Sequence, residues 1–189
     1  MGQLRLILCR AEAQHAEAIR RLVVEASRWL QAKGTDQWAR PWPDENGRKE
    51  RISRAIAAGR TWIAWDGKRV VATLTVSPNH HGIWPENARR DPAVYVRRLT
   101  VSRAYGGIGL GSQLIDWAGL RASRDYGARW IRVDVWTTNT GLHDYYRGQG
   151  FEFCGLSPEP GYPSAALFQK AVGEIEPMVA PMFREDLKG

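Results

Sequence analysis

The sequence has little of what marks disulfide-rich, membrane or leader-bearing proteins. Its two cysteines, Cys9 and Cys154, lie far apart in segments that we expect to be strands, so no disulfide framework is indicated. No apolar run approaches the ~18 residues that a membrane helix needs, and the first residues do not read as a secretory leader. We therefore expect a cytoplasmic protein that does not bind membranes.

Metal-binding and nucleic-acid-binding patterns are also missing. The two cysteines and four histidines are scattered without ligand spacing, so we expect no metal. The net charge is +7, which invites a nucleic-acid function, but the arginines are spread from Arg5 to Arg184 without a block of five or six. We expect most of them to be solvated surface charges and predict no nucleic-acid partner.

What the sequence does have is a glycine-rich turn between a strand and a helix. A β-branched run, Val94 to Val101, is followed by four glycines between Gly106 and Gly111. An amphipathic helix begins there, with apolar residues at helical spacing: Leu110, Leu114, Trp117 and Ala118. This layout points backbone N–H groups and the positive end of a helix dipole at one spot, where phosphate commonly binds. A flexible hairpin is the structural alternative.

Two better-known phosphate loops do not fit this stretch. A Walker loop has the interval between Gly106 and Gly111, but Ser112 stands where its lysine should be. The spacing G-x-G-x-x-G of a dinucleotide fingerprint starts at neither Gly107 nor Gly109.

A second stretch, Ile131 to Phe151, contains another strand, an Asn helix cap, a short helix and the pair Gly-Phe. Together the two stretches resemble the GNAT superfamily of acyl-CoA-dependent N-acetyltransferases, with its loop [QR]-x-x-G-x-[GA] and its helix N-x-x-A-x-x-x-Y-x-x-x-G-F. The loop falls on 106–111, and the helix motif on Asn139, Leu142, Tyr146, Gly150 and Phe151. The sequence departs from these patterns at two positions. Gly106 replaces the Gln or Arg of the loop, which leaves the N–H donors of the loop in place, and Leu142 replaces the Ala of the helix motif.

The resemblance implies acetyl-CoA, or another acyl-CoA, as co-substrate. Loop amides would hold its pyrophosphate, strand-four backbone groups would bind the pantetheine arm and the oxyanion, and Asn139 would cap a helix and contact the pantetheine. Four arginines near the two motifs would have its phosphates as partners: Arg97, Arg98, Arg103 and Arg147. The cofactor-binding residues implied are Leu99, Thr100, Val101, Gly106, Gly107, Ile108, Gly109, Leu110, Gly111, Ser112, Asn139 and Tyr146.

Tyr146 falls at the position of the family's general acid. A phenol with a reference pKa of ~10 stays protonated near neutral pH and can protonate a leaving thiolate. Packing between helix and sheet with an idle hydroxyl is the alternative. Tyr145 is turned ~100° away in a helix, so we do not expect it to act as the general acid.

The general base is left open by the residues. Arg97 and Arg98 occupy the strand-four neighbourhood where many family members have a Glu, and an arginine is not a base near neutral pH. Asp134, on a predicted central strand, is the first candidate, although an ion pair with Arg132 or Arg98 is equally consistent. His80 and His81 come next, and a water chain would also serve.

We expect an α/β (α+β) GNAT fold: a mixed, mostly antiparallel seven-stranded sheet with splayed central parallel strands and helices on both faces. Residues 1–172 would form one domain and 173–189 a tail that packs loosely or at a subunit contact. Strands are expected at 4–9, 61–65, 69–77, 94–101, 130–136, 150–155 and 165–172, and helices at 13–33, 45–58, from 110 to near 127, and after Asn139.

The resulting expectation is an enzyme that acetylates a primary amine, preferably of a small molecule. Trp38, His80 and His81 are candidate acceptor-site residues, although Trp38 could merely cover the core. The alternatives are acetylation of a protein or peptide amine, and an acyl-CoA-binding module without turnover. A homodimer is possible because the family is often dimeric.

Overall fold

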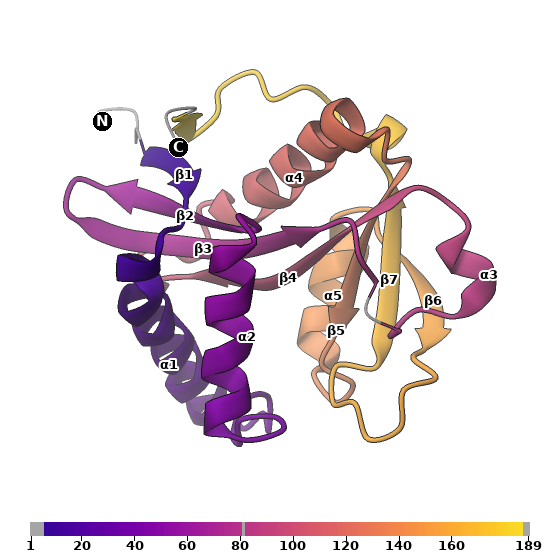
Figure 1. Ribbon diagram of the computed structural model, residues 1–189, viewed down its shortest axis with the longest axis horizontal. Helices are drawn as coiled ribbons and strands as arrows, with labels where there is room; N and C mark the ends of the chain where they lie inside the picture. The colour runs from indigo at the N-terminus through magenta and orange to yellow at the C-terminus, as the bar shows by residue number, and fades with distance from the viewer. Residues whose placement is uncertain (1–5, 81, 187–189) are drawn as a thin grey trace. The chain divides into compact units, whose positions relative to one another are not determined.

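A computed structural model describes residues 6–80 and 82–186 of the chain (Figure 1). The expected elements are present within a few residues of their predicted bounds. Three short 3-10 turns cover Ala13–His15, Arg103–Tyr105 and Val172–Glu174. The helices and strands in chain order are β1 Leu6–Arg10, α1 Ala16–Ala32, α2 Glu45–Ala57, β2 Thr61–Asp66, β3 Arg69–Ser77, α3 Glu86–Arg89, β4 Ala93–Val101, α4 Leu110–Tyr126, β5 Trp130–Val135, α5 Thr140–Gly148, β6 Glu152–Leu156, β7 Ala166–Ala171 and β8 Phe183–Glu185.

The strands form one open sheet in the order β6-β7-β5-β4-β3-β2-β1-β8. Most neighbours are antiparallel, whereas β4 pairs with β5, and β1 with β8, in parallel. The mixed α/β fold with a central parallel pair is therefore as expected. The strand number is eight rather than seven.

The chain divides into two compact units. One contains the residues up to Thr75, Arg98–Leu114 and the residues from Met178 onward; the other contains Val76–Arg97 and Ile115–Pro177. β3, β4 and α4 each pass from one unit to the other. The expected single domain over residues 1–172 stays a prediction.

The first unit contains β1, β2, β8 and the two helices α1 and α2, which contact each other (Figure 1). Local signals set the helix ends: Gly34 follows α1 with φ +77°, and the Asp44 side chain accepts a hydrogen bond from Gly47 N–H at 2.8 Å at the start of α2. Apolar side chains from both helices and the sheet form its core, among them Ala11, Ile19, Ile52, Ile56 and Ile63.

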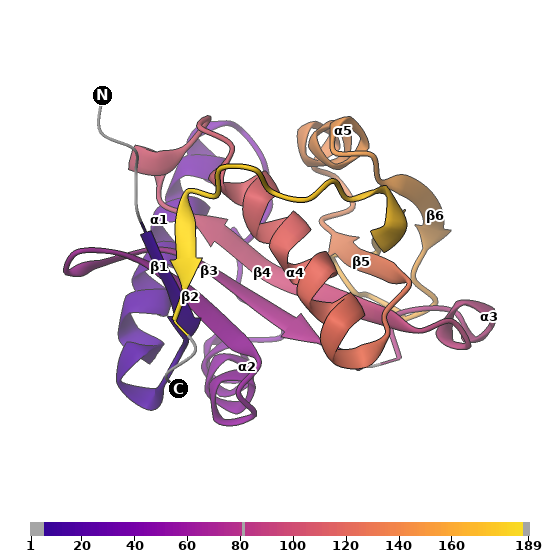
Figure 2. The ribbon, with the colours of Figure 1, turned by 90° about the horizontal axis from the view of Figure 1, so that it is seen from above.

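The C-terminal segment was expected to be a loosely packed tail, but part of it joins the sheet. β8 lies beside β1, with Leu6 opposite Phe183 (Figure 2). Phe183 is 5% exposed, and Leu6 N–H donates to the Met182 carbonyl at 2.8 Å. The reason is that an edge strand presents unpaired N–H and C=O groups, which another segment of the chain can satisfy. This segment supplies the eighth strand.

The second unit contains β5, β6, β7, α3 and α5. β7 pairs with both β5 and β6. Its core includes Ile83, Trp84, Tyr95 and Leu167, of which Trp84 and Leu167 are fully buried. The segment 78–92, expected to be irregular, contains the short helix α3.

Across the described part of the chain, none of the helices combines the length and the apolar character needed to cross a membrane.

Candidate functional site

The glycine loop lies in the first unit, between β4 and α4. Gly107 has φ +80° and Gly109 has φ +88°, the left-handed conformation that glycine adopts without a Cβ penalty. Gly106, with φ −71°, does not use this freedom. The strand, glycine turn and helix therefore follow one another as the sequence predicts, and the hairpin alternative does not hold.

The loop leaves backbone donors and open space at the start of α4. Gln113 N–H donates to the Gly109 carbonyl at 3.1 Å, which makes Gly109 the residue where the helix begins. The N–H groups of Leu110 and Gly111 in the first turn have no acceptor within the helix. A Cβ at Gly107 would meet no atom within 4 Å. These features fit an anion such as pyrophosphate, and Ile108, 46% exposed, borders the same turn.

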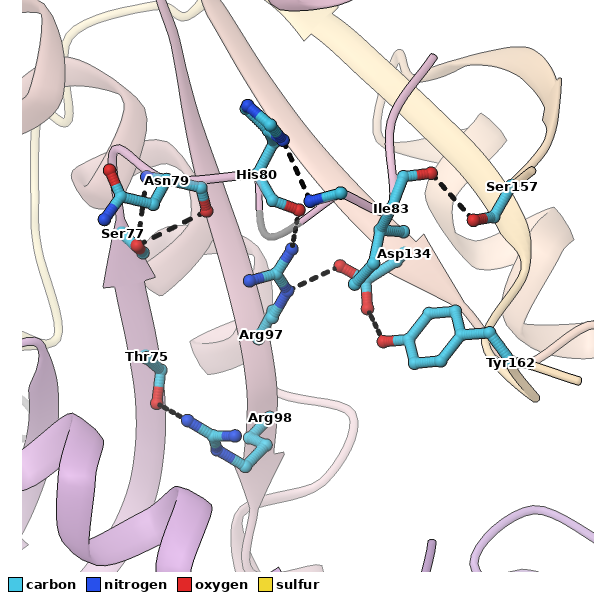
Figure 3. Close-up of polar contacts among 11 residues, drawn as sticks. Thr75, Ser77, Asn79, His80, Ile83, Arg97, Arg98, Asp134, Ser157 and Tyr162 are labelled. Carbon is cyan, nitrogen blue, oxygen red and sulfur yellow. Dashed lines mark hydrogen bonds and ion pairs between the residues drawn. The ribbon is translucent and has the colours of Figure 1, made fainter. Parts of the chain in front are cut away.

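The backbone of β4 is irregular at Arg98. Arg98 has φ +51°, which is rare for a residue other than glycine and is a strained conformation within a strand. Its guanidinium donates to Thr75 Oγ1 at 3.0 Å, as Figure 3 shows. Leu99, Thr100 and Val101, the predicted pantetheine-binding residues, follow Arg98 in the chain.

The parallel strands β4 and β5 part at a defined point in the second unit. Their pairing runs from Ala93 opposite Trp130 to Val96 opposite Val133 and stops there. Beyond it, β5 stays paired with β7 as far as Val135. The splayed parallel pair that the family resemblance implies is therefore present.

An ion pair lies next to the point where β4 and β5 part. Arg97 Nε donates to Asp134 Oδ1 at 2.9 Å, and the two side chains are 12% and 5% exposed (Figure 3). Arg97 also donates to the His80 carbonyl at 3.1 Å, and the Tyr162 hydroxyl donates to Asp134 Oδ2 in a short hydrogen bond. Burial alone would lower the pKa of Arg97, but the charge of Asp134 and the hydrogen bond to it, together with the Tyr162 and Tyr95 phenols, raise the pKa above its ordinary value.

The ion-pair partners predicted for Asp134, Arg132 and Arg98, are not the ones found. The register explains this: one step beyond Val96 and Val133, Arg97 and Asp134 are neighbours on one face of the parallel pair. Asp134 as the general base stays a prediction.

Arg132 is a buried cation held by neutral groups. It is 1% exposed and donates to the Ala88 carbonyl at 2.7 Å, to Tyr95 Oη at 3.2 Å and to Gln169 Oε1 at 3.1 Å. Its guanidinium also lies over the Trp84 ring, 4.7 Å from the centroid. These contacts fix α3 and the segment before β4 against β5.

Tyr146 lies in α5 and is 7% exposed. Its ring stands edge-on to Phe151, 5.3 Å away, and stacks on Phe168 at 6.3 Å. Among the residues described, its hydroxyl makes no hydrogen bond. Burial, together with the nearby acidic groups of Tyr145 and Asp134, raises the pKa of the phenol above its ordinary value. Tyr145 is 37% exposed, as expected for a side chain on another helix face.

Asn139 caps α5 as predicted. Its Oδ1 accepts a hydrogen bond from Leu142 N–H at 3.0 Å, and the residue is 9% exposed. Asp134, Asn139, Tyr146 and His80 thus belong to the second unit. The residues from Leu99 to Ser112 belong to the first, as does Trp38.

The three predicted acceptor-site residues have different outcomes. His80 is half-buried, its Nδ1 accepts from Gly82 N–H at 3.0 Å, and burial, followed by the charges of three arginines, lowers its pKa. Trp38 has φ +59°, and its carbonyl accepts from Ser27 Oγ at 2.9 Å. His81 lies outside the described residues.

Cys9 and Cys154 are free thiols, and burial raises the pKa of both. Within residues 6–80 and 82–186, no three His, Cys, Asp or Glu side chains are grouped so that they could hold a metal ion.

The contacts of Tyr162 and Arg97 with Asp134 were not predicted from the sequence. Tyr162 lies in the Pro- and Gly-rich turn between β6 and β7, where no periodicity marks it. Arg97 was expected to face a phosphate of the co-substrate and was excluded as a base. Strand pairing was the one available signal, because the register that sets Val96 beside Val133 also sets Arg97 beside Asp134.

The comparisons with known proteins agree with this geometry. The family profile described as "Acetyltransferase (GNAT) family" matches residues 20–151. A curated relative, "Uncharacterized N-acetyltransferase YesJ" of Bacillus subtilis (strain 168), is 28% identical over 168 residues, covering 87% of this chain and 89% of the relative.

Solved structures share the fold. A GNAT-family acetyltransferase from Listeria monocytogenes is 23% identical with a TM-score of 0.65, covering 88% of this chain and 94% of the other. The paia N-acetyltransferase from Thermoplasma acidophilum, solved in complex with coenzyme A, is 16% identical with a TM-score of 0.65 and covers 88% and 98%.

Proposed function

The chain belongs to the acetyltransferase (GNAT) family of acyl-CoA-dependent N-acetyltransferases, and we propose that it moves an acetyl group from acetyl-CoA to a primary amine of a small molecule. The observation that carries the cofactor assignment is the turn of Gly107 and Gly109 at the start of α4. Its left-handed glycines, open space and helix N–H groups fit a pyrophosphate.

In the proposed reaction the amine nitrogen attacks the thioester carbonyl directly, a C–N bond forms and the C–S bond breaks. The co-substrate supplies the activated acetyl group. Backbone groups of Leu99, Thr100 and Val101 would hold the pantetheine arm, and a strand-four N–H near Leu99 would stabilise the oxyanion, since preorganised donors are often the largest contribution to such catalysis. Because the interaction uses backbone groups, these side chains can vary.

Tyr146 is the proposed general acid, which would give its proton to the leaving thiolate of CoA. Three observations support this role: the side chain is buried, its pKa is raised, and its hydroxyl has no hydrogen-bond partner among the described residues. A phenol in this state is neutral at physiological pH and still has its proton to donate. Asn139, which caps the same helix, would contact the pantetheine.

Asp134 was predicted to take the proton of the acceptor ammonium. Its contacts support a different proposal, in which Asp134 holds Arg97 and Tyr162 in place. Both oxygens of this carboxylate already have partners, Oδ1 in Arg97 and Oδ2 in the Tyr162 hydroxyl. A chain of water molecules would then carry the proton away.

Trp38, in the first unit, and His80, in the second, are each proposed to contact the acceptor. The unusual φ of Trp38 supports a functional role because strained backbone collects at binding sites. The neutral imidazole favoured by the lowered pKa of His80 would not repel an ammonium. A protein amine as acceptor is the alternative, and comparing free amines with peptides as substrates distinguishes the two.

Calorimetric titration with acetyl-CoA tests the cofactor assignment. The parent should bind at micromolar strength, and Gly109→Glu should lose binding because a side chain and a negative charge would occupy the pyrophosphate position. Gly109→Ala is the matched control, since it shares the backbone strain at φ +88° without the charge and should bind more tightly than Gly109→Glu.

If the parent fails to bind acetyl-CoA and other acyl-CoA thioesters, the cofactor assignment is wrong. If it binds but no amine is acetylated, the chain is a binding module rather than an enzyme.

A further inference from the structure

One arginine beside the glycine loop has its guanidinium held in place without an ion pair. Arg103 begins the 3-10 turn that leads from β4 into the loop. Its guanidinium lies over the Trp29 ring, 3.8 Å from the centroid, and its backbone N–H donates to Glu25 Oε1 at 2.6 Å. The same oxygen accepts from Ser102 Oγ at 3.0 Å. Glu25 and Trp29, one helical turn apart on α1, therefore fix both the backbone and the side chain of Arg103.

The charge of this guanidinium is not neutralised. In the described part of the chain, no carboxylate oxygen lies within 4.0 Å of it, whereas several other arginines, such as Arg20, Arg21 and Arg48, form ion pairs. Arg103 is exposed, and Trp29 is 37% exposed. Since a planar guanidinium stacked on an aromatic ring keeps its N–H edges free, Arg103 is a preoriented donor for an anion.

Gly106 leaves space beside the loop for this side chain. Its φ of −71° and ψ of 144° are open to any residue, so the backbone does not require glycine. A Cβ there would lie 2.7 Å from Arg103 Nη2 and 3.0 Å from Cζ. The absence of a side chain at Gly106 is what allows the guanidinium to lie against the loop.

We propose that Arg103 is a phosphate-binding residue for the acyl-CoA, with Trp29 and Glu25 as its positioning residues. Resting on the proposed function, this inference gives the loop a side-chain cation in addition to its backbone N–H groups. It also explains Gly106, which departs from the Gln or Arg of the family's loop pattern: the cation comes from three residues earlier. A guanidinium and a phosphate form charge-assisted, bidentate hydrogen bonds.

The test is calorimetric titration of acetyl-CoA into the parent and Arg103→Ala. Removing one charge-assisted phosphate contact should weaken binding about tenfold, and the loss should shrink at high salt. Arg54→Ala, an exposed arginine on α2 with the same change in charge, is the control and should bind like the parent. Arg103→Lys should bind acetyl-CoA with intermediate affinity, since lysine keeps the charge but lacks the two parallel N–H groups of the guanidinium.

Two further measurements sharpen the result. Gly106→Arg should weaken binding in the parent by displacing Arg103, but partly restore it in the Arg103→Ala background. The second measurement compares the parent and Arg103→Ala with dephospho-CoA, which lacks the 3′-phosphate. If the tenfold difference in affinity persists, the contact is with the pyrophosphate; if it disappears, the contact is with the 3′-phosphate.

Equal affinities for the parent and Arg103→Ala, with both proteins folded by circular dichroism, would overturn the proposal while leaving the cofactor assignment intact. A parent that binds no acyl-CoA overturns the cofactor assignment itself.

Discussion

At the scale of single residues, this protein places polar groups where burial changes their chemistry. Tyr146 is packed between Phe151 and Phe168, and burial raises the pKa of its phenol. For a group whose folded pKa is raised above the unfolded value, the contribution to stability is complete below the unfolded pKa. It is then lost as the pH rises through the folded pKa. Tyr146 therefore stays protonated and stabilising throughout the neutral range.

We predict that Tyr146→Phe lowers kcat by about 10²–10⁴-fold, the usual contribution of a general acid, while acetyl-CoA binding stays close to that of the parent. Because the pKa of Tyr146 is raised, the parent's rate should not fall through loss of this proton as the pH approaches 10. Steady-state kinetics across pH 6 to about 10, with calorimetry at neutral pH, measure both effects. A Phe variant with unchanged kcat would show that the hydroxyl is idle.

At the scale of elements, the parting of β4 and β5 determines which side chains meet. The pairing of β4 with β5 ends at Val96 and Val133, and the side chains of the next residue on each strand, Arg97 and Asp134, form an ion pair. Through His80 and Tyr162 the pair connects the segment before α3 with the β6–β7 turn. Replacing one partner of a buried ion pair leaves the other charge uncompensated, which makes this pair sensitive to substitution.

Asp134→Asn should lower the free energy of unfolding by about 3–5 kcal/mol, because Arg97 would remain buried without its counter-charge. Urea denaturation gives the value, and the double variant Arg97→Met/Asp134→Leu should regain most of the loss. Tyr162→Phe, which removes one hydrogen bond to the carboxylate, should cost about 1.5–3 kcal/mol. If Asp134→Asn unfolds like the parent but loses turnover, Asp134 is a base and the anchoring proposal fails.

At the scale of the whole molecule, the chain returns from its C-terminal part to its beginning. The residues from Met178 onward belong to the same unit as β1, where β8 covers an edge of the sheet and Met182 N–H donates to Gln113 Oε1 at 2.8 Å. The last strand therefore contacts both the first strand and the helix that begins at the glycine loop.

We expect Phe183→Ala to destabilise the first unit by about 3–5 kcal/mol, as for other buried aromatic residues. Val179→Ala is the control from the same segment, since Val179 is 99% exposed, and should change stability by no more than about 0.5 kcal/mol. Thermal melting of the two variants provides the comparison. Equal melting temperatures for Phe183→Ala and the parent would mean that the strand is dispensable.

Local features were predictable from the sequence because the interactions behind them span only a few residues. The left-handed glycines Gly107 and Gly109, the cap of Asn139 on Leu142 and the helix end at Gly34 depend on backbone geometry and on hydrogen bonds within about one helical turn.

Only the tertiary structure decided which distant groups meet. Arg97 is the partner of Asp134 because of the strand register, and Tyr162 reaches the same carboxylate because of the path of a turn. Arg103 stacks on Trp29 because α1 packs close to the loop. Long-range pairing such as that of β8 with β1 is set by which edge of the sheet is left unpaired, which no local pattern encodes. The sequence therefore determined the glycine loop, and the packing of the chain determined the side chains that surround it.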